Sequence, residues 1–173
     1  MSRTAKTLSW TLAVMLLAAV LVIANLPEKK PAVSGAQVGE CLPDFSVTTL
    51  DGETFTLSEQ RGKIVVINIW ATWCTPCVKE LPNFDRLQSE RADVTVLALH
   101  APPVTSDVAD YLSSFSYTIP FAVDEDNSLC ELLGASTVLP QTIIVDSEGI
   151  VSYNSVGALS FESLCELVDT AKH

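Results

Sequence analysis

Residues 64–77 decide the fold, and they read Ile64-Val65-Val66-Ile67-Asn68-Ile69-Trp70-Ala71-Thr72-Trp73-Cys74-Thr75-Pro76-Cys77. The first seven residues are apolar on both faces apart from Asn68, which is typical of a central strand covered by helices. From Thr75 to about Glu90 apolar residues recur at helical spacing, which predicts a helix directly after the strand. Both cysteines are therefore expected at a helix start, where unpaired N–H groups and the helix dipole stabilise a thiolate.

Cys74 and Cys77 are separated by two residues, which lets them close a small disulfide ring and reopen it. We predict that Cys74 is the nucleophile, because only the thiolate attacks a disulfide sulfur. Cys77 follows one helical turn later, is expected to lie deeper, and suits the resolving role that releases a mixed disulfide. Thr75 and Pro76 carry no positive charge, which favours a reducing over an oxidising redox poise.

Three other uses of this cysteine pair have to be weighed against redox chemistry. A zinc site needs about four ligands, and the sequence has no second Cys-x-x-Cys and no His pair. A c-type haem attachment needs His after the second cysteine, where Val78 stands. A purely structural disulfide that closes so short a loop removes little entropy from the unfolded chain. The zinc and structural alternatives stay open, but the pattern favours a redox-active disulfide.

Residues 68–77, followed further along the chain by Leu139-Pro140-Gln141-Thr142, resemble the thioredoxin superfamily. More narrowly they resemble the membrane-anchored TlpA/ResA-like thiol-disulfide oxidoreductases, which work outside the cytoplasm. The resemblance covers about residues 38–171. It implies an α/β thioredoxin fold with a central mixed sheet flanked by helices, an N-terminal β-hairpin extension, a central βα insertion, and no cofactor or metal.

The resemblance also assigns active-site support to residues around the dithiol. Leu139–Pro140 is expected to be a cis bond beside the dithiol, which turns the Leu139 main chain toward a substrate strand. Trp73 would offer a flat apolar landing surface for a polypeptide, although a core position is the alternative. The supporting, substrate-binding positions are Trp73, Thr75, Pro76, Leu139 and Pro140.

The resolving step also needs a group that takes the proton from Cys77. Thioredoxin has a buried acid at the position of Asn68, and an amide cannot serve that purpose. Glu80 lies one turn beyond Cys77, at the place of an active-site glutamate in ResA-like proteins. We therefore predict that Glu80 is catalytic together with Cys74 and Cys77. The alternative is a first-turn carboxylate favoured only by the helix dipole.

The sequence predicts further elements on either side of this motif. Residues 45–50 and 54–57 form an expected hairpin around Asp51-Gly52. Other strands are expected at 94–99, 120–123, 142–146 and 150–153, and further helices at 106–115, at 127–133 and after Ser160. The same N-terminal pattern occurs in peroxiredoxins, but those proteins require Thr at position 71 and Pro at position 67, where Ala and Ile stand.

The N-terminal part predicts a membrane anchor. Residues 8–26 carry no charge and nearly match the ~20 residues that cross a bilayer. Residues 1–7, with Arg3 and Lys6, fit a short cytoplasmic tail. The interpretation is an uncleaved signal-anchor, a linker at 27–37 and a thioredoxin-like domain at 38–173 on the extracytoplasmic side of the cell membrane. A cleaved signal peptide is the alternative, with a poor cleavage site at residues 22–24.

The net charge of the chain limits the classes of partner that it can bind. The net charge is −11, and an acidic surface argues against nucleic acid and mainly supports solubility. By resemblance, the expected partners are disulfides of exported proteins, with apocytochrome c favoured, and an integral-membrane thiol donor of the CcdA or DsbD type. A reductant for an extracytoplasmic methionine sulfoxide reductase or peroxidase is an alternative. A copper-delivery module is another, although it usually has three residues between its cysteines.

Three cysteines and two histidines lie outside the motif. An odd number of cysteines in an oxidising compartment suggests one extra disulfide and one free thiol, but the sequence does not choose a pair among Cys41, Cys130 and Cys165. His100 and His173 have no partner pattern, and we interpret both as non-functional.

Overall fold

The computed structural model describes residues 35–172. The predicted tail, anchor and most of the linker, together with His173, lie outside the described residues. Within residues 35–172, no helix is long and apolar enough to cross a membrane.

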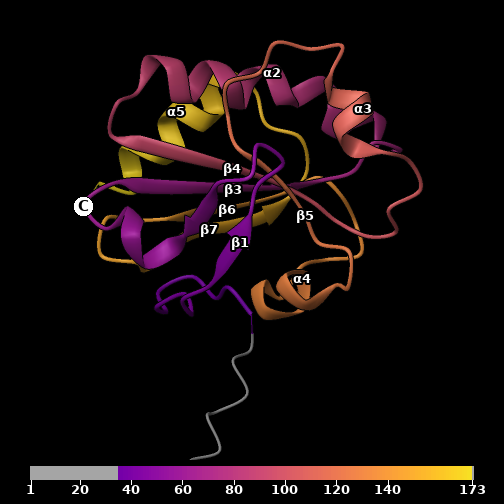
Figure 1. Ribbon diagram of the computed structural model, residues 1–173. Coiled ribbons are helices and arrows are strands. Elements are labelled where there is room, and N and C mark those ends of the chain that lie inside the picture. Colours follow the sequence, from indigo (N-terminus) through magenta and orange to yellow (C-terminus); the bar gives the residue numbers. More distant parts are fainter. Residues whose placement is uncertain (1–34, 173) are drawn as a thin grey trace, which may run out of the picture. The chain divides into compact units, whose positions relative to one another are not determined.

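A five-stranded mixed sheet forms the centre of the domain, in the order β5-β4-β3-β6-β7 (Figure 1). The central strand β3 runs parallel to β4, and β4 runs parallel to β5. Strand β3 pairs antiparallel with β6, and β6 pairs antiparallel with β7. The strands are β3 (Ile64–Trp70), β4 (Val94–His100), β5 (Phe121–Val123), β6 (Gln141–Val145) and β7 (Val151–Val156). The mixed sheet expected of a thioredoxin fold is confirmed.

A second, two-stranded sheet precedes the central one. Strands β1 (Ser46–Thr48) and β2 (Thr54–Thr56) pair antiparallel, with Val47 opposite Phe55. Gly52 in the turn between them adopts a positive φ, which a glycine accommodates without strain. The predicted N-terminal hairpin extension is therefore confirmed, and a short 3-10 helix η1 (Leu57–Gln60) leads from it to β3.

Helices cover both faces of the central sheet, which explains why β3 is apolar along its whole length. Helices α2 (Thr75–Glu90) and α5 (Phe161–Thr170) pack on the face to which Val66 and Trp70 belong. Helix α4 (Ser128–Leu133), η1 and the hairpin pack on the face of Val65, Ile67 and Ile69. Every residue of β3 is buried as a result.

Most predicted boundaries agree with the structure, and one helix is shorter than expected. The helix predicted over 106–115 is α3 (Val108–Leu112), whose N-cap Asp107 accepts a hydrogen bond from the Asp110 N–H. Helix α2 continues through Pro82. Helix α5 begins after Ser160, whose side chain accepts from the Ser163 N–H, as the sequence predicts. Helix α4 ends at Gly134 in the left-handed conformation.

Replacing the buried Phe84 of α2 should destabilise the domain far more than replacing the exposed Phe115. Phe84 is fully buried between α2 and the sheet, whereas 42% of Phe115 is exposed. We expect Phe84→Ala to lower the free energy of unfolding by about 3–5 kcal/mol, because the lost transfer energy adds to an unfilled cavity. Denaturant unfolding of the oxidised protein measures the change. Phe115→Ala, the matched control, should cost about 1 kcal/mol or less, and equal losses would contradict this packing.

Candidate active site

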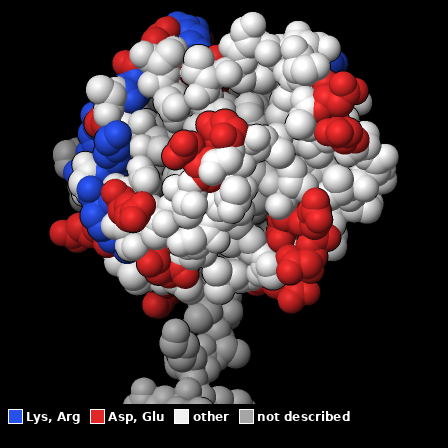
Figure 2. Space-filling model, viewed as in Figure 1, with Lys and Arg blue, Asp and Glu red and all other residues white. Residues whose placement is uncertain are grey.

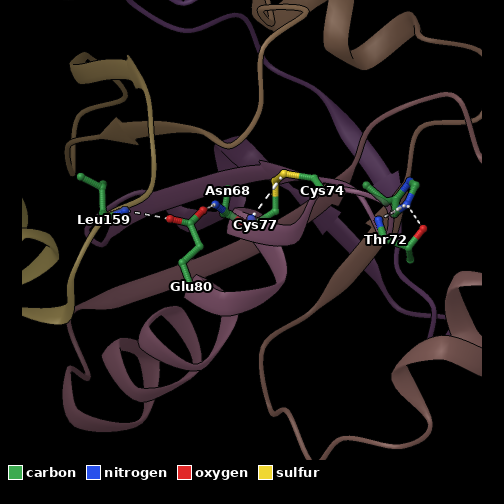
Figure 3. Close-up of a disulfide and its surroundings, with 7 residues drawn as sticks. Asn68, Thr72, Cys74, Cys77, Glu80 and Leu159 are labelled. Atoms are coloured by element: carbon green, nitrogen blue, oxygen red, sulfur yellow. Dashed lines mark hydrogen bonds between the residues drawn. A yellow bond between two sulfur atoms is a disulfide. The ribbon is translucent and has the colours of Figure 1, made fainter.

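Cys74 and Cys77 form a disulfide at the start of α2 (Figure 3). Cys74 is the N-cap residue, and the Cys77 N–H donates a hydrogen bond to its Sγ at 3.3 Å. In the reduced protein this N–H and the other unpaired donors of the first turn favour a thiolate on Cys74. Cys74 is 5% exposed and Cys77 is fully buried, so an incoming disulfide reaches Cys74 first. The predicted difference in depth is therefore found.

The loop before Cys74 is held in place by the last residue of β4 and by the segment that follows this strand. The Thr72 N–H donates to His100 Nε2 at 3.0 Å, and the Thr72 hydroxyl shares a hydrogen bond with that of Ser106 at 3.1 Å. The Trp73 indole N–H donates to the main-chain oxygen of Pro103 at 3.3 Å. These hydrogen bonds hold Thr72 and Trp73, which precede the nucleophile, against a separate element of the fold.

His100 is a site residue that the sequence analysis missed, because we interpreted it as non-functional. It is fully buried, and burial lowers the pKa of its imidazole, which keeps the ring neutral. A neutral ring can accept at Nε2, as the bond from Thr72 requires. The strand expected at 94–99 ends one residue before His100, whereas in the structure β4 includes His100, which lies opposite Trp70.

Trp73 lies at the surface, whereas Leu139 is half-buried against the cluster that contains both cysteines and Pro140 is buried. Half of Trp73 is exposed, so the alternative that it is a core residue is wrong. The prediction that its ring is an apolar contact surface for a polypeptide stays open. The Leu139–Pro140 bond is cis, as the resemblance implied. Within residues 35–172, no hydrogen bond engages the main chain of Leu139. Its N–H and C=O groups are thus available to a polypeptide, while Thr75 and Pro76 lie exposed at the same helix start.

Glu80 lies almost wholly inside the protein, with 2% of it exposed. Its Oε1 accepts from Asn68 Nδ2 and its Oε2 accepts from the Leu159 N–H, both at 2.8 Å (Figure 3). Burial raises the pKa of this carboxyl to about 7, against the opposing effect of the two hydrogen bonds. Glu80 can therefore change its protonation state near neutral pH, beside the strand residue Asn68. Its catalytic role stays a prediction.

The three cysteines outside the motif form no disulfide with the site. Cys41, Cys130 and Cys165 are all free, so the disulfide that an odd cysteine count suggested does not form among them. Burial is the main cause that raises the pKa of the Cys130 thiol, so this thiol stays protonated. The described residues contain no group of three or more His, Cys, Asp or Glu side chains that could hold a metal ion.

Glu80→Gln should stabilise the oxidised protein at alkaline pH relative to the wild type. The folded pKa of Glu80 lies near 7 and the unfolded pKa near 4.5, so folding stability falls as the pH rises between these values. A glutamine does not titrate there, and a rotated Asn68 amide, whose Oδ1 has no partner, can accept its new N–H. The stability difference between variant and wild type should grow by up to about 3 kcal/mol between pH 4.5 and pH 8.

Urea unfolding at pH 5 and pH 8 measures this difference. The exposed Glu148→Gln is the matched control and should show a pH-independent offset. A difference for Glu80→Gln that does not change with pH would contradict the raised pKa.

Comparisons with known proteins agree with this geometry. The Redoxin family matches residues 37–167. The thioredoxin-like protein YneN of Bacillus subtilis is 33% identical over 139 residues, which cover 78% of this chain and 81% of YneN. The thiol-disulfide oxidoreductase ResA of Geobacillus thermodenitrificans is 30% identical over 167 residues, or 94% of each chain.

A solved structure shares the fold as well. The thiol:disulfide interchange protein of the thioredoxin family from Chlorobium tepidum superposes with a TM-score of 0.70 and 26% identity, over 78% of this chain and 97% of that one. The match covers most of the sequence, and the site holds a disulfide at the start of α2. The chain therefore belongs to the Redoxin family and is a thiol-disulfide oxidoreductase of the ResA-like group.

Proposed function

We propose that this protein reduces disulfides of exported proteins outside the cytoplasm, tethered to the membrane by residues 8–26. The favoured target is the disulfide of an apocytochrome c, and the favoured electron donor is an integral-membrane thiol carrier of the CcdA or DsbD type. The observation that carries the proposal is the pair at the start of α2, in which Cys74 reaches the surface and Cys77 does not.

The reaction consists of two exchanges. The Cys74 thiolate attacks one sulfur of the target disulfide, which forms a mixed disulfide and releases the other target sulfur as a thiolate that takes up a proton. Cys77 then attacks the Cys74 sulfur, closes the Cys74–Cys77 disulfide and releases the second target thiol. The target gains two electrons and two protons, and the enzyme dithiol is oxidised. A dithiol donor reverses this oxidation for the next cycle.

Glu80 supports the second exchange as a proton acceptor. Cys77 must lose its proton to become a nucleophile, and no water reaches a fully buried thiol directly. A carboxyl with a pKa of about 7 is half ionised near neutral pH and can both take and return a proton. Figure 3 shows Glu80 on the same helix as Cys77, joined to Asn68 of the adjacent strand.

Three observations support the location. Residues 8–26 have the length and composition of a membrane-spanning helix. The match to ResA of Geobacillus thermodenitrificans covers 94% of this chain, so it extends into this stretch. A Cys-x-x-Cys disulfide that turns over also fits a compartment in which target disulfides form.

Glu80→Gln should slow the resolving step about a hundredfold at pH 7, the lower end of what a general base contributes. The reduced protein is mixed with a disulfide-bridged peptide, and acid-quenched samples are analysed by mass spectrometry. The variant should accumulate the mixed disulfide on Cys74. In the wild type the rate of the resolving step should rise as the pH increases through 7, and the variant should lack this rise. The control Glu148→Gln should behave as the wild type. An unchanged pH profile without accumulation would remove Glu80 from the mechanism.

Cys77→Ala should trap the physiological target, because the mixed disulfide on Cys74 can no longer be resolved. Captured proteins from the membrane fraction of the source cells are released with dithiothreitol and identified by mass spectrometry. We expect apocytochrome c. Capture of a methionine sulfoxide reductase or a peroxidase instead would redirect the same chemistry to those enzymes. A wild-type protein that fails to catalyse insulin reduction by dithiothreitol would refute the reductase and favour a metal-delivery role.

A further inference from the structure

A cavity of about 370 Å³ lies next to Trp73, the residue that precedes Cys74. One side consists of Trp73 and Leu139, together with Pro102 and Pro103. The other side consists of helix α4 and the segment that follows it, up to Thr137. The cavity therefore extends from Trp73, next to Cys74 in the chain, to α4.

The dithiol side of this cavity is apolar and fixed. The indole N–H of Trp73 is bonded to the Pro103 carbonyl, which holds the ring in place while half of it stays exposed. Beside Leu139, Val138 is 59% exposed. A large solvent-exposed apolar surface next to a reactive disulfide is suited to an apolar side chain of the polypeptide that presents the target disulfide.

The α4 side of the cavity carries one acidic side chain. Glu131 is exposed, lines the cavity and accepts a hydrogen bond from Asn127 at 3.1 Å. Glu125 and Asp126 are exposed just before α4. No Lys or Arg side chain lines the cavity. Figure 2 shows acidic side chains gathered on the side where Figure 1 places α4, whereas basic side chains gather at the opposite edge.

We propose that this cavity is a docking site for the target polypeptide and selects segments that carry an apolar residue and a lysine or arginine next to the disulfide. The apolar side chain contacts Trp73 and Leu139, and the basic side chain pairs with Glu131. Two observations support this occupant: Trp73, the residue that precedes Cys74, lines the cavity, and the far side of the cavity carries the acidic side chain of Glu131 with no Lys or Arg. The inference rests on the proposed reductase function and specifies its substrate class.

Reversing the charge of residue 131 in the enzyme and of one residue in the peptide tests the docking site. The reduced full-length protein in detergent is mixed with disulfide-bridged peptides that differ only beside the first cysteine, where they carry Lys or Glu. A second pair carries Leu or Gly at the neighbouring position. Each second-order rate constant is divided by the rate constant of the same protein with 2-hydroxyethyl disulfide, which is small and neutral. Variants are Glu131→Lys, Glu131→Gln and the control Glu148→Lys, which lies in the turn between β6 and β7.

The wild type should prefer the Lys peptide over the Glu peptide by roughly three- to tenfold at low salt. Glu131→Lys should invert this preference, and Glu131→Gln should reduce it toward equality. Glu148→Lys should keep the wild-type order, and the Leu peptide should react faster than the Gly peptide. The same charge preference in Glu131→Lys as in the wild type, or equal rates for Leu and Gly, would overturn the docking site. A wild type that does not reduce even 2-hydroxyethyl disulfide would overturn the reductase function itself.

Discussion

The junction between β3 and α2 constrains everything else in this domain. Strand β3 is hydrogen-bonded on both edges and covered on both faces, so its carboxyl end has one position and one direction. Helix α2 starts five residues later with Cys74 as its N-cap, and its buried side packs back onto the same strand. The reactive sulfur is thereby held at a helix start on a rigid support.

The same junction determines where a proton acceptor can sit. Asn68 is the single polar residue of β3, and its side chain projects toward α2, where it donates to Glu80. An amide at this strand position cannot take a proton, but it can orient a carboxylate that comes from the helix. Without the hydrogen bonds from Asn68 and Leu159, a carboxylate with this burial would be harder still to ionise. The strand and the helix therefore together set the pKa of the Glu80 carboxyl, the proposed proton acceptor.

Local patterns explain how much could be predicted from the sequence. The bounds of strand β3 agree with those of the apolar run in the sequence, and the bounds of helix α2 agree with those of the helical spacing. Both elements are predictable because they are long and strongly patterned. The depth of Cys77 follows from the same periodicity. His100 escaped prediction because its partner Thr72 is 28 residues away and because a lone histidine in a strand carries no spacing signal. The Leu159 bond to Glu80 spans 79 residues and arises only when α5 packs beside α2.

Chemistry and substrate choice are separated in this architecture. The cysteines, Asn68 and Glu80 belong to β3, α2 and the loop between them, and their arrangement follows from close packing in the core. The surface beyond Trp73 belongs instead to α4 and the loops around it, which pack only on one side and leave the charged face in solvent. Substitutions on that face cost little stability, because exposed charges contribute little to folding. Target preference can therefore change at residues such as Glu131 while the redox centre stays intact.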